Sequence, residues 1–286
     1  MTVLRAAGPF GTVVESDGTV IKPRTGYRLG ADASALTVLN RIALIDDAGR
    51  LADKPRPLLR WAADAKLGQD PALVGQVAAR RDRAVAALRS AGQAVRRLRA
   101  DPEWRLAVGL GNRANAHEIG LSLHGSYGWP VIPGSSLKGL AAAWAAASGA
   151  DQETVRRILG GPRPGEDPRK PGAAVRGTVR FLDAIPAGRP VTVAVDVLTP
   201  HVKPYYDAIA QGSAAVPAPA EYHNPVPVNF LTVSGAFAVD VHGPDAADVG
   251  QAVSWLTEAA DQLGAGAKTA AGYGYLRLSP RPEREG

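Results

Sequence analysis

Hydrophobic residues recur at helical spacing through residues 71–100. Arginines largely fill the positions between them, and the apolar residues are mostly three or four positions apart: Leu73, Val77, Val85, Leu88 and Val95. The pattern predicts one long amphipathic helix with a basic face. That face either lies in solvent while the apolar stripe packs on the protein body, or contacts phosphates. The helix alone favours the first interpretation.

From about residue 105 onward the apolar residues fall into shorter segments. Residues 104–111 and 118–125 are predicted strands. Residues 128–149 contain a strand end, a Pro-Gly turn and an alanine-rich helix that closes at a glycine. Ser135 or Ser136 is expected to cap the start of this helix.

Strands alternate with a second helix in the C-terminal half. Residues 202–225 are rich in proline and alanine and have no strong period. They predict a loop longer than the usual connection inside a compact domain, which suggests a functional excursion. Residues 245–264 form a predicted helix. Strands are predicted over residues 177–186, 189–201, 227–243 (as a strand pair) and 272–278.

This order predicts an α+β protein with a ferredoxin-like (RRM-like) β-α-β-β-α-β core. We expect the core over residues 105–279, with a glycine-rich loop and an insertion at about 202–225, and a tail over 280–286. Residues 1–104 are expected to form an N-terminal extension that packs on the core and contains the basic helix of about 71–100. The open sheet of such a core is the platform that RNA-recognition modules use.

The charge of the chain favours a polyanionic partner. The net charge is +6 over 286 residues. Most of the excess lies in one segment, because residues 80–105 hold eight arginines against Asp82, Asp101 and Glu103. The apolar fraction of 45% and the charged fraction of 21% are ordinary for a soluble globular protein.

Cysteine is absent, which excludes disulfides, thiolate metal sites and cysteine nucleophiles and fits a cytoplasmic location. No apolar run approaches the ~20 residues of a membrane span. The first residues lack the basic start and apolar block of a signal peptide.

The segment GAGAKTAAGYGYL, residues 264–276, has the composition of a phosphate-binding loop. A Walker loop requires a glycine before its lysine and a helix after it, whereas Ala267 precedes Lys268 and the predicted helix comes first. The dinucleotide-binding fingerprint fails for the same reason. The loop is therefore predicted to be a left-handed helix cap and turn, an anion cradle, or both. Its glycines flank Lys268 and Thr269: Gly264, Gly266, Gly272 and Gly274.

A second anion-binding candidate is the segment IPGSSLKG. Gly134 permits a tight turn, and Lys138 lies in the first turn of the predicted helix. A cation at a helix start is mildly unfavourable, and an external anion would relieve that conflict. A solvated lysine beside an ordinary serine cap explains the segment equally well.

No spacing in the chain fixes a catalytic pair. Asp183 and Asp196 lie in or at the end of predicted strands, where either could pair with an arginine such as Arg180. His201 with Asp207 suggests a general base, but only geometry could support that role.

A metal site is not expected. His117, Glu118 and His124 lack the i, i+4 spacing of helical ligands, and odd separations in a strand point to opposite faces.

Five segments resemble, in their order along the chain, the RAMP superfamily of CRISPR effector proteins: PVIPGSSLKGLAAAW, VRFLDAIP, DVLTPHVKPYY, PVPVNFLTV and LGAGAKTAAGYG. Within that superfamily, TPHVKPYY and PVNFLTV are most similar to the sixth RAMP subunit of the type III-B (Cmr) complex. The resemblance covers roughly residues 105–278. It implies a ferredoxin-like RNA-binding fold with a glycine-rich loop beside its last strand.

The resemblance also implies a subunit that ends the backbone filament and holds the 3′ region of the guide RNA (crRNA), without nuclease activity of its own and without a cofactor. The implied partners are crRNA, target RNA and other Cmr subunits: the backbone RAMP subunit, the small helical subunit and the neighbouring end RAMP subunit. The implied RNA contacts are Gly134, Ser135, Ser136 and Lys138 at the first helix, and Gly264, Gly266, Lys268 and Thr269 at the glycine-rich loop.

In such proteins the long loop acts as a thumb against the guide–target duplex. Its root holds residues whose types suit phosphate contact and base stacking: His201, Lys203, Tyr205 and Tyr206. Packing under the loop is an equal interpretation for the two tyrosines.

Two further functions remain open. One is a metal-independent endoribonuclease that processes guide RNA, with His201 as base and Tyr205 or Lys203 stabilising charge. The other is an architectural protein whose basic helix docks a small helical neighbour.

Overall fold

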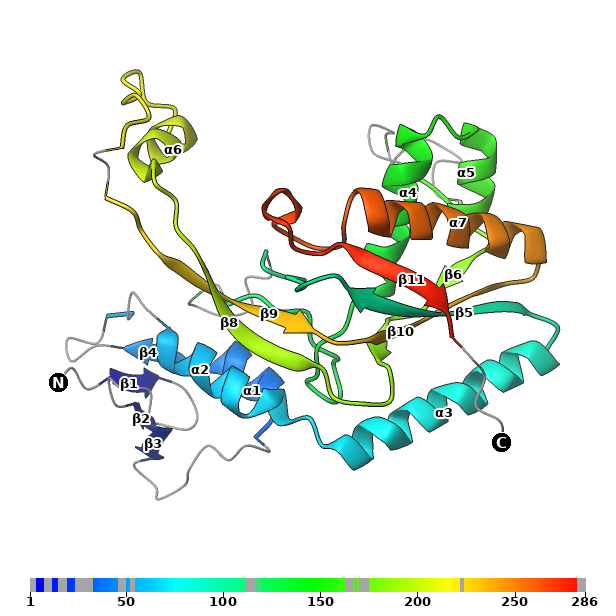
Figure 1. Cartoon of the computed structure of the whole chain (residues 1–286), viewed down its shortest axis with the longest axis horizontal. Helices are drawn as coiled ribbons and strands as arrows, with labels where there is room; N and C mark the ends of the chain where they lie inside the picture. Colours follow the sequence, from blue (N-terminus) through cyan, green and yellow to red (C-terminus); the bar gives the residue numbers. More distant parts are fainter. Residues whose placement is uncertain are drawn as a thin grey trace.

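The computed structural model describes residues 4–7, 12–14, 20–23, 33–45, 50, 51, 55–111, 117, 119–162, 167, 169, 175–221 and 224–281 (Figure 1). Its main sheet has five strands, of which four follow the order β11-β5-β10-β6, while β7 also pairs with β10. All these pairings are antiparallel. The strands are β5 (Ala94–Pro102), β6 (Arg180–Phe181), β7 (Ile185–Pro186), β10 (Phe237–Gly243) and β11 (Leu276–Pro280).

Two helices, α4 (Gly134–Ala147) and α7 (Ala246–Gln262), cover one face of this sheet, and the shorter α5 (Gln152–Leu159) lies beside them (Figure 1). Alternate residues of β10 point to these helices: Phe237, Val239 and Val241 are buried in one core with α7 residues Val249 and Leu256. The mixed α/β composition and the helices predicted over 128–149 and 245–264 are confirmed.

The helix predicted over residues 71–100 is shorter than expected. Helix α3 (Pro71–Ser90) ends before Gly92, whose φ of 77° turns the chain, and β5 follows. Val95 fits a helical spacing by coincidence. The residues after it instead alternate, with Leu98 and Ala100 buried under α7 and Arg97 on the other side.

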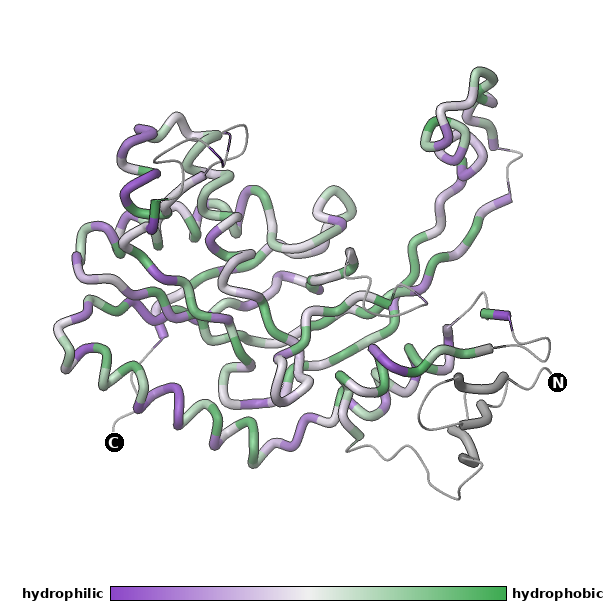
Figure 2. Tube along the Cα trace, turned by 180° about the vertical axis from the view of Figure 1, so that it is seen from behind, coloured by the Kyte–Doolittle hydropathy of each residue, from purple (hydrophilic) through white to green (hydrophobic). Residues whose placement is uncertain are grey.

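Helix α3 covers the sheet face opposite α4 and α7 (Figure 1). Val74 and Val77 of α3 pack with Ala238 of β10 and Ile185 of β7. The expectation of an open sheet face is therefore wrong. Figure 2 shows the hydrophilic and hydrophobic segments alternating along α3, as expected for a helix with one packed side.

An ion network joins α3 to the sheet. The Asp240 carboxylate of β10 is 1% exposed and accepts a hydrogen bond of 2.9 Å from Arg97 Nε, while Arg81 of α3 lies 3.5 Å away. Arg97 also donates to Asp82 at 2.6 Å. Burial disfavours the charged guanidinium, but the bonds and charges of Asp82 and Asp240 outweigh burial and raise the pKa of Arg97. Some arginines of the basic segment thus hold the fold together.

Strands β8 (Thr192–Leu198) and β9 (Val228–Ser234) form an antiparallel hairpin that extends away from the body (Figure 1). We call residues 192–234 the arm. Its tip carries helix α6 (Lys203–Ala210), so the loop predicted over 202–225 begins as a helix. The predicted strand pair of 227–243 is split between two sheets, because β9 pairs with β8 whereas β10 joins the main sheet.

The N-terminal elements form a small sheet, β3-β2-β1-β4, and two helices that lie near the root of the arm (Figure 1). Their bounds are β1 (Leu4–Ala7), β2 (Thr12–Val14), β3 (Val20–Pro23), α1 (Ala35–Arg41), β4 (Ala43–Ile45), α2 (Arg56–Asp64) and the 3-10 helix η1 (Lys66–Gly68). The strands predicted over 104–111 and 118–125 are reduced to bridges at Leu106 and Leu123. Among the helices described, none is both long and apolar enough to cross a bilayer.

Candidate nucleic-acid interface

Backbone hydrogen bonds fix the glycine-rich loop to residues 105–107. The Ala267 N–H donates to the Ala107 carbonyl at 2.8 Å, and the Gly274 N–H donates to the Arg105 carbonyl at 2.8 Å. Inside the loop, the Ala265 N–H donates to the Gly274 carbonyl at 2.7 Å. The loop is thus a closed turn between α7 and β11.

Two glycines permit this close packing. Gly266 has a φ of 89°, and a Cβ atom there would lie 2.5 Å from the Ala107 carbonyl oxygen. Gly274 has a φ of 86°, and a Cβ atom there would overlap the Ala265 carbonyl oxygen. The turn interpretation of the loop is confirmed. The Gly264 N–H, predicted to contact RNA, donates to the Ala259 carbonyl and ends α7.

Lys268 occupies the tip of the loop in the left-handed region, with a φ of 63°, just before the 3-10 helix η2 (Thr269–Ala271). This conformation is costly for a residue with a side chain. Its ammonium lies 4.9 Å from the centroid of the Phe230 ring, and no carboxylate of the described residues pairs with it. Within the described ranges, the N–H groups of Gly266, Lys268, Thr269 and Ala270 have no acceptor. Successive unbonded amides beside a cation form a concavity suited to an anion.

The start of α4 differs from the prediction. Neither serine caps the helix, whose N-cap residue is Pro133. Instead, Asp183 Oδ1 accepts a 2.7 Å hydrogen bond from the Gly134 N–H. The Asp183 carboxylate therefore supplies the negative charge that the helix start favours, and part of the argument for an external anion there falls away. Ser135, Ser136 and Lys138 are exposed on this turn.

A row of hydrogen-bonded extended segments connects the two candidate sites. The Ala107 carbonyl bonds the glycine-rich loop, the Val108 carbonyl accepts from the Ser122 N–H at 2.8 Å, and the Ser122 carbonyl accepts from the Val131 N–H at 3.0 Å. Each of these three hydrogen-bonded steps spans about one strand spacing. The backbone of the loop and the segment that leads into α4 are therefore on the order of 15 Å apart. A single extended polyanion could therefore follow both sites.

An aromatic and ionic cluster lies between the glycine-rich loop and the arm. The Tyr273 hydroxyl bonds to Asp196 of β8, which also pairs with Arg105 at 2.9 Å. The Tyr273 ring meets Phe230 of β9 with centroids 5.5 Å apart and Trp104 with centroids 4.8 Å apart. Asp196 thus pairs with an arginine, as expected, but with Arg105 and not with the suggested Arg180, which donates to the Gly177 and Val179 carbonyls. We call Trp104, Arg105, Asp196, Phe230 and Tyr273 the arm-root cluster.

The pKa values of this cluster follow from its geometry. Burial and the hydrogen bond to Asp196 raise the pKa of Tyr273 to about 12. Burial would raise the pKa of Asp196, but the bonds from Tyr273, the Val197 N–H and Arg105 outweigh burial and lower it. Both groups therefore keep the protonation states that maintain the bond across a wide pH range.

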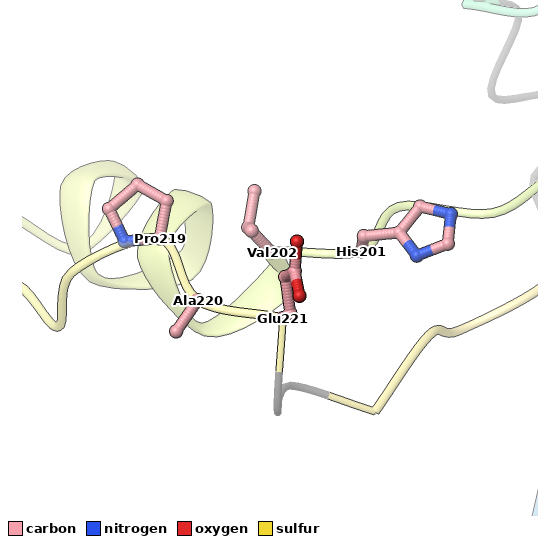
Figure 3. Close-up of a pocket in the computed structure, with 5 residues that line it drawn as sticks. All are labelled: His201, Val202, Pro219, Ala220 and Glu221. Atoms are coloured by element: carbon pink, nitrogen blue, oxygen red, sulfur yellow. The ribbon is translucent and has the colours of Figure 1, made fainter.

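The four residues predicted at the root of the long loop lie at the arm tip, far from the glycine-rich loop (Figure 1). Lys203 pairs with Asp207 one turn along α6, so this carboxylate is not reserved for His201. Tyr206 is 59% exposed, and its ring meets the Tyr205 ring edge-on at 5.4 Å. A pocket of about 520 Å³ at the arm tip is lined by five residues, which Figure 3 draws as sticks: His201, Val202, Pro219, Ala220 and Glu221.

The histidines considered for a metal have structural partners. His117 Nε2 accepts from the Leu44 N–H at 2.7 Å, and His124 Nδ1 accepts from the Ser126 N–H at 3.1 Å. Burial lowers the pKa of His124. Glu118 lies outside the described residues. In the part of the chain that the structure describes, no three His, Asp or Glu side chains gather as a metal site would require.

No sequence motif marks the arm-root cluster. Trp104 and Arg105 precede Asp196 by about ninety residues, and only the fold brings them together. The available signal was an arginine and a tryptophan side by side at the end of a basic segment.

A family model described as the RAMP superfamily matches residues 71–277. The chain belongs to the RAMP superfamily. The match begins at α3 and includes β5, so the RAMP region starts earlier than the resemblance to residues 105–278 implied.

Two individual proteins give further comparisons for this RAMP protein. The CRISPR system Cmr subunit Cmr6 of Pyrococcus furiosus is 40% identical over 107 residues, which span 35% of this chain and 30% of that protein. A chain in the cryo-EM structure of the Type III-B Cmr-beta bound to cognate target RNA shares the fold. Its TM-score is 0.56 and its identity is 20%, with 79% of this chain and 75% of that chain covered.

The crystal structure of Cmr6 from Pyrococcus furiosus is also similar. It is 25% identical with a TM-score of 0.40, and the alignment covers 66% of this chain and 98% of that one.

Proposed function

We propose that this chain is a non-catalytic, crRNA-binding subunit of a type III-B CRISPR effector complex. In this proposal it ends the backbone filament at the 3′ region of the guide and contacts target RNA and the other Cmr subunits. Membership of the RAMP superfamily and the partial similarity to Cmr6 support the assignment. The order β11-β5-β10-β6, with α4 and α7 on one face, supports a ferredoxin-like core.

The observation that carries the RNA-binding proposal is the tip of the glycine-rich loop. Lys268 is held in a left-handed conformation beside backbone N–H groups that have no acceptor among the described residues. Closure of the turn alone requires glycines but no lysine at the strained position. A phosphate bound there would accept hydrogen bonds from these amides and neutralise the ammonium.

Helix α3 makes the sheet face an unsuitable RNA platform, because Val74, Val77 and the ion network around Asp240 fill it. RNA would instead follow the loop edge, from Lys268 along the extended segments to the exposed first turn of α4 with Ser135, Ser136 and Lys138. This route contacts mainly the phosphate backbone, so it would accept guides of any sequence.

A paired lysine variant tests this route. The full-length chain carrying Lys138→Ala and Lys268→Ala is compared with the wild type for binding a labelled single-stranded RNA at several salt concentrations. Each lost phosphate contact lowers the slope of log K against log salt by about 0.7. Affinity falls as the salt concentration rises from about 50 to 200 mM. In the variant, which lacks two phosphate contacts, this fall should be about sevenfold smaller than in the wild type.

A control variant removes the same charge elsewhere. Arg83 of α3 and Arg189 in the turn between β7 and β8 are both exposed, and Arg83→Ala with Arg189→Ala should keep the wild-type slope. If the lysine and arginine variants bind RNA with equal slopes, the assignment of the two lysines is wrong. If the wild-type chain itself shows no salt-dependent RNA binding, the proposed function is wrong.

A further inference from the structure

Trp104 is an exposed tryptophan at the edge of the glycine-rich loop. It is 52% exposed, whereas Trp61, Trp129 and Trp255 are buried and Trp144 is half-buried. The residues on either side of it bond to the loop: the Glu103 N–H donates to the Tyr275 carbonyl at 3.0 Å, and the Arg105 carbonyl accepts from the Gly274 N–H. The backbone of Trp104 is therefore fixed to the loop that carries Lys268.

Two neighbouring side chains support the Trp104 ring. Tyr273 lies at 4.8 Å between centroids with an interplanar angle of 39°, and Arg105 Cζ lies 5.4 Å from the ring centroid. Because Asp196 holds both the Tyr273 hydroxyl and the Arg105 guanidinium, these two supports lie together. The rest of the ring is open to solvent. A half-exposed indole held next to the loop offers a surface for a flat ligand.

The surroundings indicate which flat ligand. The Trp104 ring, the Tyr273 ring, the Phe230 ring and the Lys268 ammonium follow one another at 4.8, 5.5 and 4.9 Å. The indole and the ammonium are thus no more than the sum of these separations apart, on the order of 15 Å. Proteins bind single-stranded RNA by stacking its bases on aromatic rings and by placing cations against its phosphates. The Trp104 ring and the anion site at Lys268 offer both on one edge of the molecule.

We propose that Trp104 is a stacking platform for a nucleobase of the RNA whose phosphates lie at the glycine-rich loop. This inference rests on the proposed function and adds to it a residue that contacts a base. Arg105, 5.4 Å from the ring centroid, adds a cation next to the stacked pair. Every base has a π-face, so the platform accepts a base without specifying its identity.

The test compares Trp104→Leu and Trp104→Phe with the wild type, using the full-length chain and two probes: an oligouridylate, and the same oligomer made abasic. Leucine keeps apolar bulk against Tyr273 but removes the ring, whereas phenylalanine keeps a ring. Trp104→Leu should weaken oligouridylate binding by roughly 5- to 150-fold, the loss expected for one stacked base, and leave the salt slope and the abasic probe unchanged. Trp104→Phe should restore most of the affinity.

Leu73→Ala, at an exposed apolar position on α3, is the matched control and should bind both probes as the wild type does. Equal oligouridylate affinity for Trp104→Leu and the wild type overturns the inference but not the proposed function. The inference is also overturned if Trp104→Leu binds RNA as tightly as the wild type but no longer co-purifies with other Cmr subunits. That result would assign Trp104 to a protein interface. A wild-type chain that binds neither probe overturns both.

Discussion

The ion network under α3 predicts that removing the Asp240 carboxylate destabilises the fold. Asp240 is 1% exposed and accepts from Arg97, whose side chain is 7% exposed, while Arg81 lies 3.5 Å away. Asp240→Ala removes the carboxylate that both arginines share and leaves their charges at a covered interface. The α3–sheet contact should therefore lose much of its stability.

The magnitude follows from what remains. Breaking a buried ion pair by removing one partner costs about 3–5 kcal/mol. Arg97 keeps Asp82 at 2.6 Å, and Asp82 is 23% exposed, so the lower end of about 3 kcal/mol is expected here. For a domain of this size, that loss lowers the melting temperature by about 6–12 °C. Asp240→Asn keeps the volume and one acceptor, and should lose about half as much.

Calorimetric melting of the full-length chain measures the effect, with Asp101→Ala as the control. Asp101 pairs with Arg99 in an exposed bridge, which contributes at most about 1 kcal/mol. A combined Asp240→Leu and Arg97→Met variant should recover most of the stability that Asp240→Ala loses, because no unpaired charge from that pair stays buried. A loss below about 1 kcal/mol in Asp240→Ala would refute the view that α3 seals the sheet.

The arm-root cluster predicts a pH effect: because the pKa of Tyr273 is raised to about 12, its contribution to stability is complete below about pH 10 and is lost as the pH rises toward 12. Urea unfolding at pH 9 and 11 should therefore show a smaller alkaline loss for Tyr273→Phe than for the wild type, and equal losses would contradict the Tyr273–Asp196 bond. The arm tip should not cut RNA, since Asp207 pairs with Lys203. Purified wild-type chain incubated with labelled repeat RNA in chelator should leave it intact, and specific fragments that disappear in His201→Ala would instead favour the endoribonuclease.

Local patterns in the sequence predicted local structure well. The helices at 134–147 and 246–262 combine a clear start, apolar periodicity and a closing glycine, and each forms close to its predicted range. The turn at Gly264 and Gly266 follows from positive φ, which glycine adopts without steric cost. These features depend on neighbours within a few residues.

Features that depend on distant residues could not be predicted. Arg97 of β5 lies in a basic segment that resembles a solvated face, and its partner Asp240 comes more than a hundred residues later in the chain. Likewise, the cap of α4 comes from Asp183 on another segment, although serines stand at the expected positions. In both cases, a charge supplied from elsewhere decides the outcome.

Tyr273 joins the root of the arm to the glycine-rich loop, because this loop residue bonds to Asp196 of β8 and packs against Phe230 of β9. A shift of β8 or β9 at the arm root would change the contacts of Tyr273 with Asp196 and of Lys268 with Phe230. Movement of the arm and binding at the loop are therefore expected to influence each other.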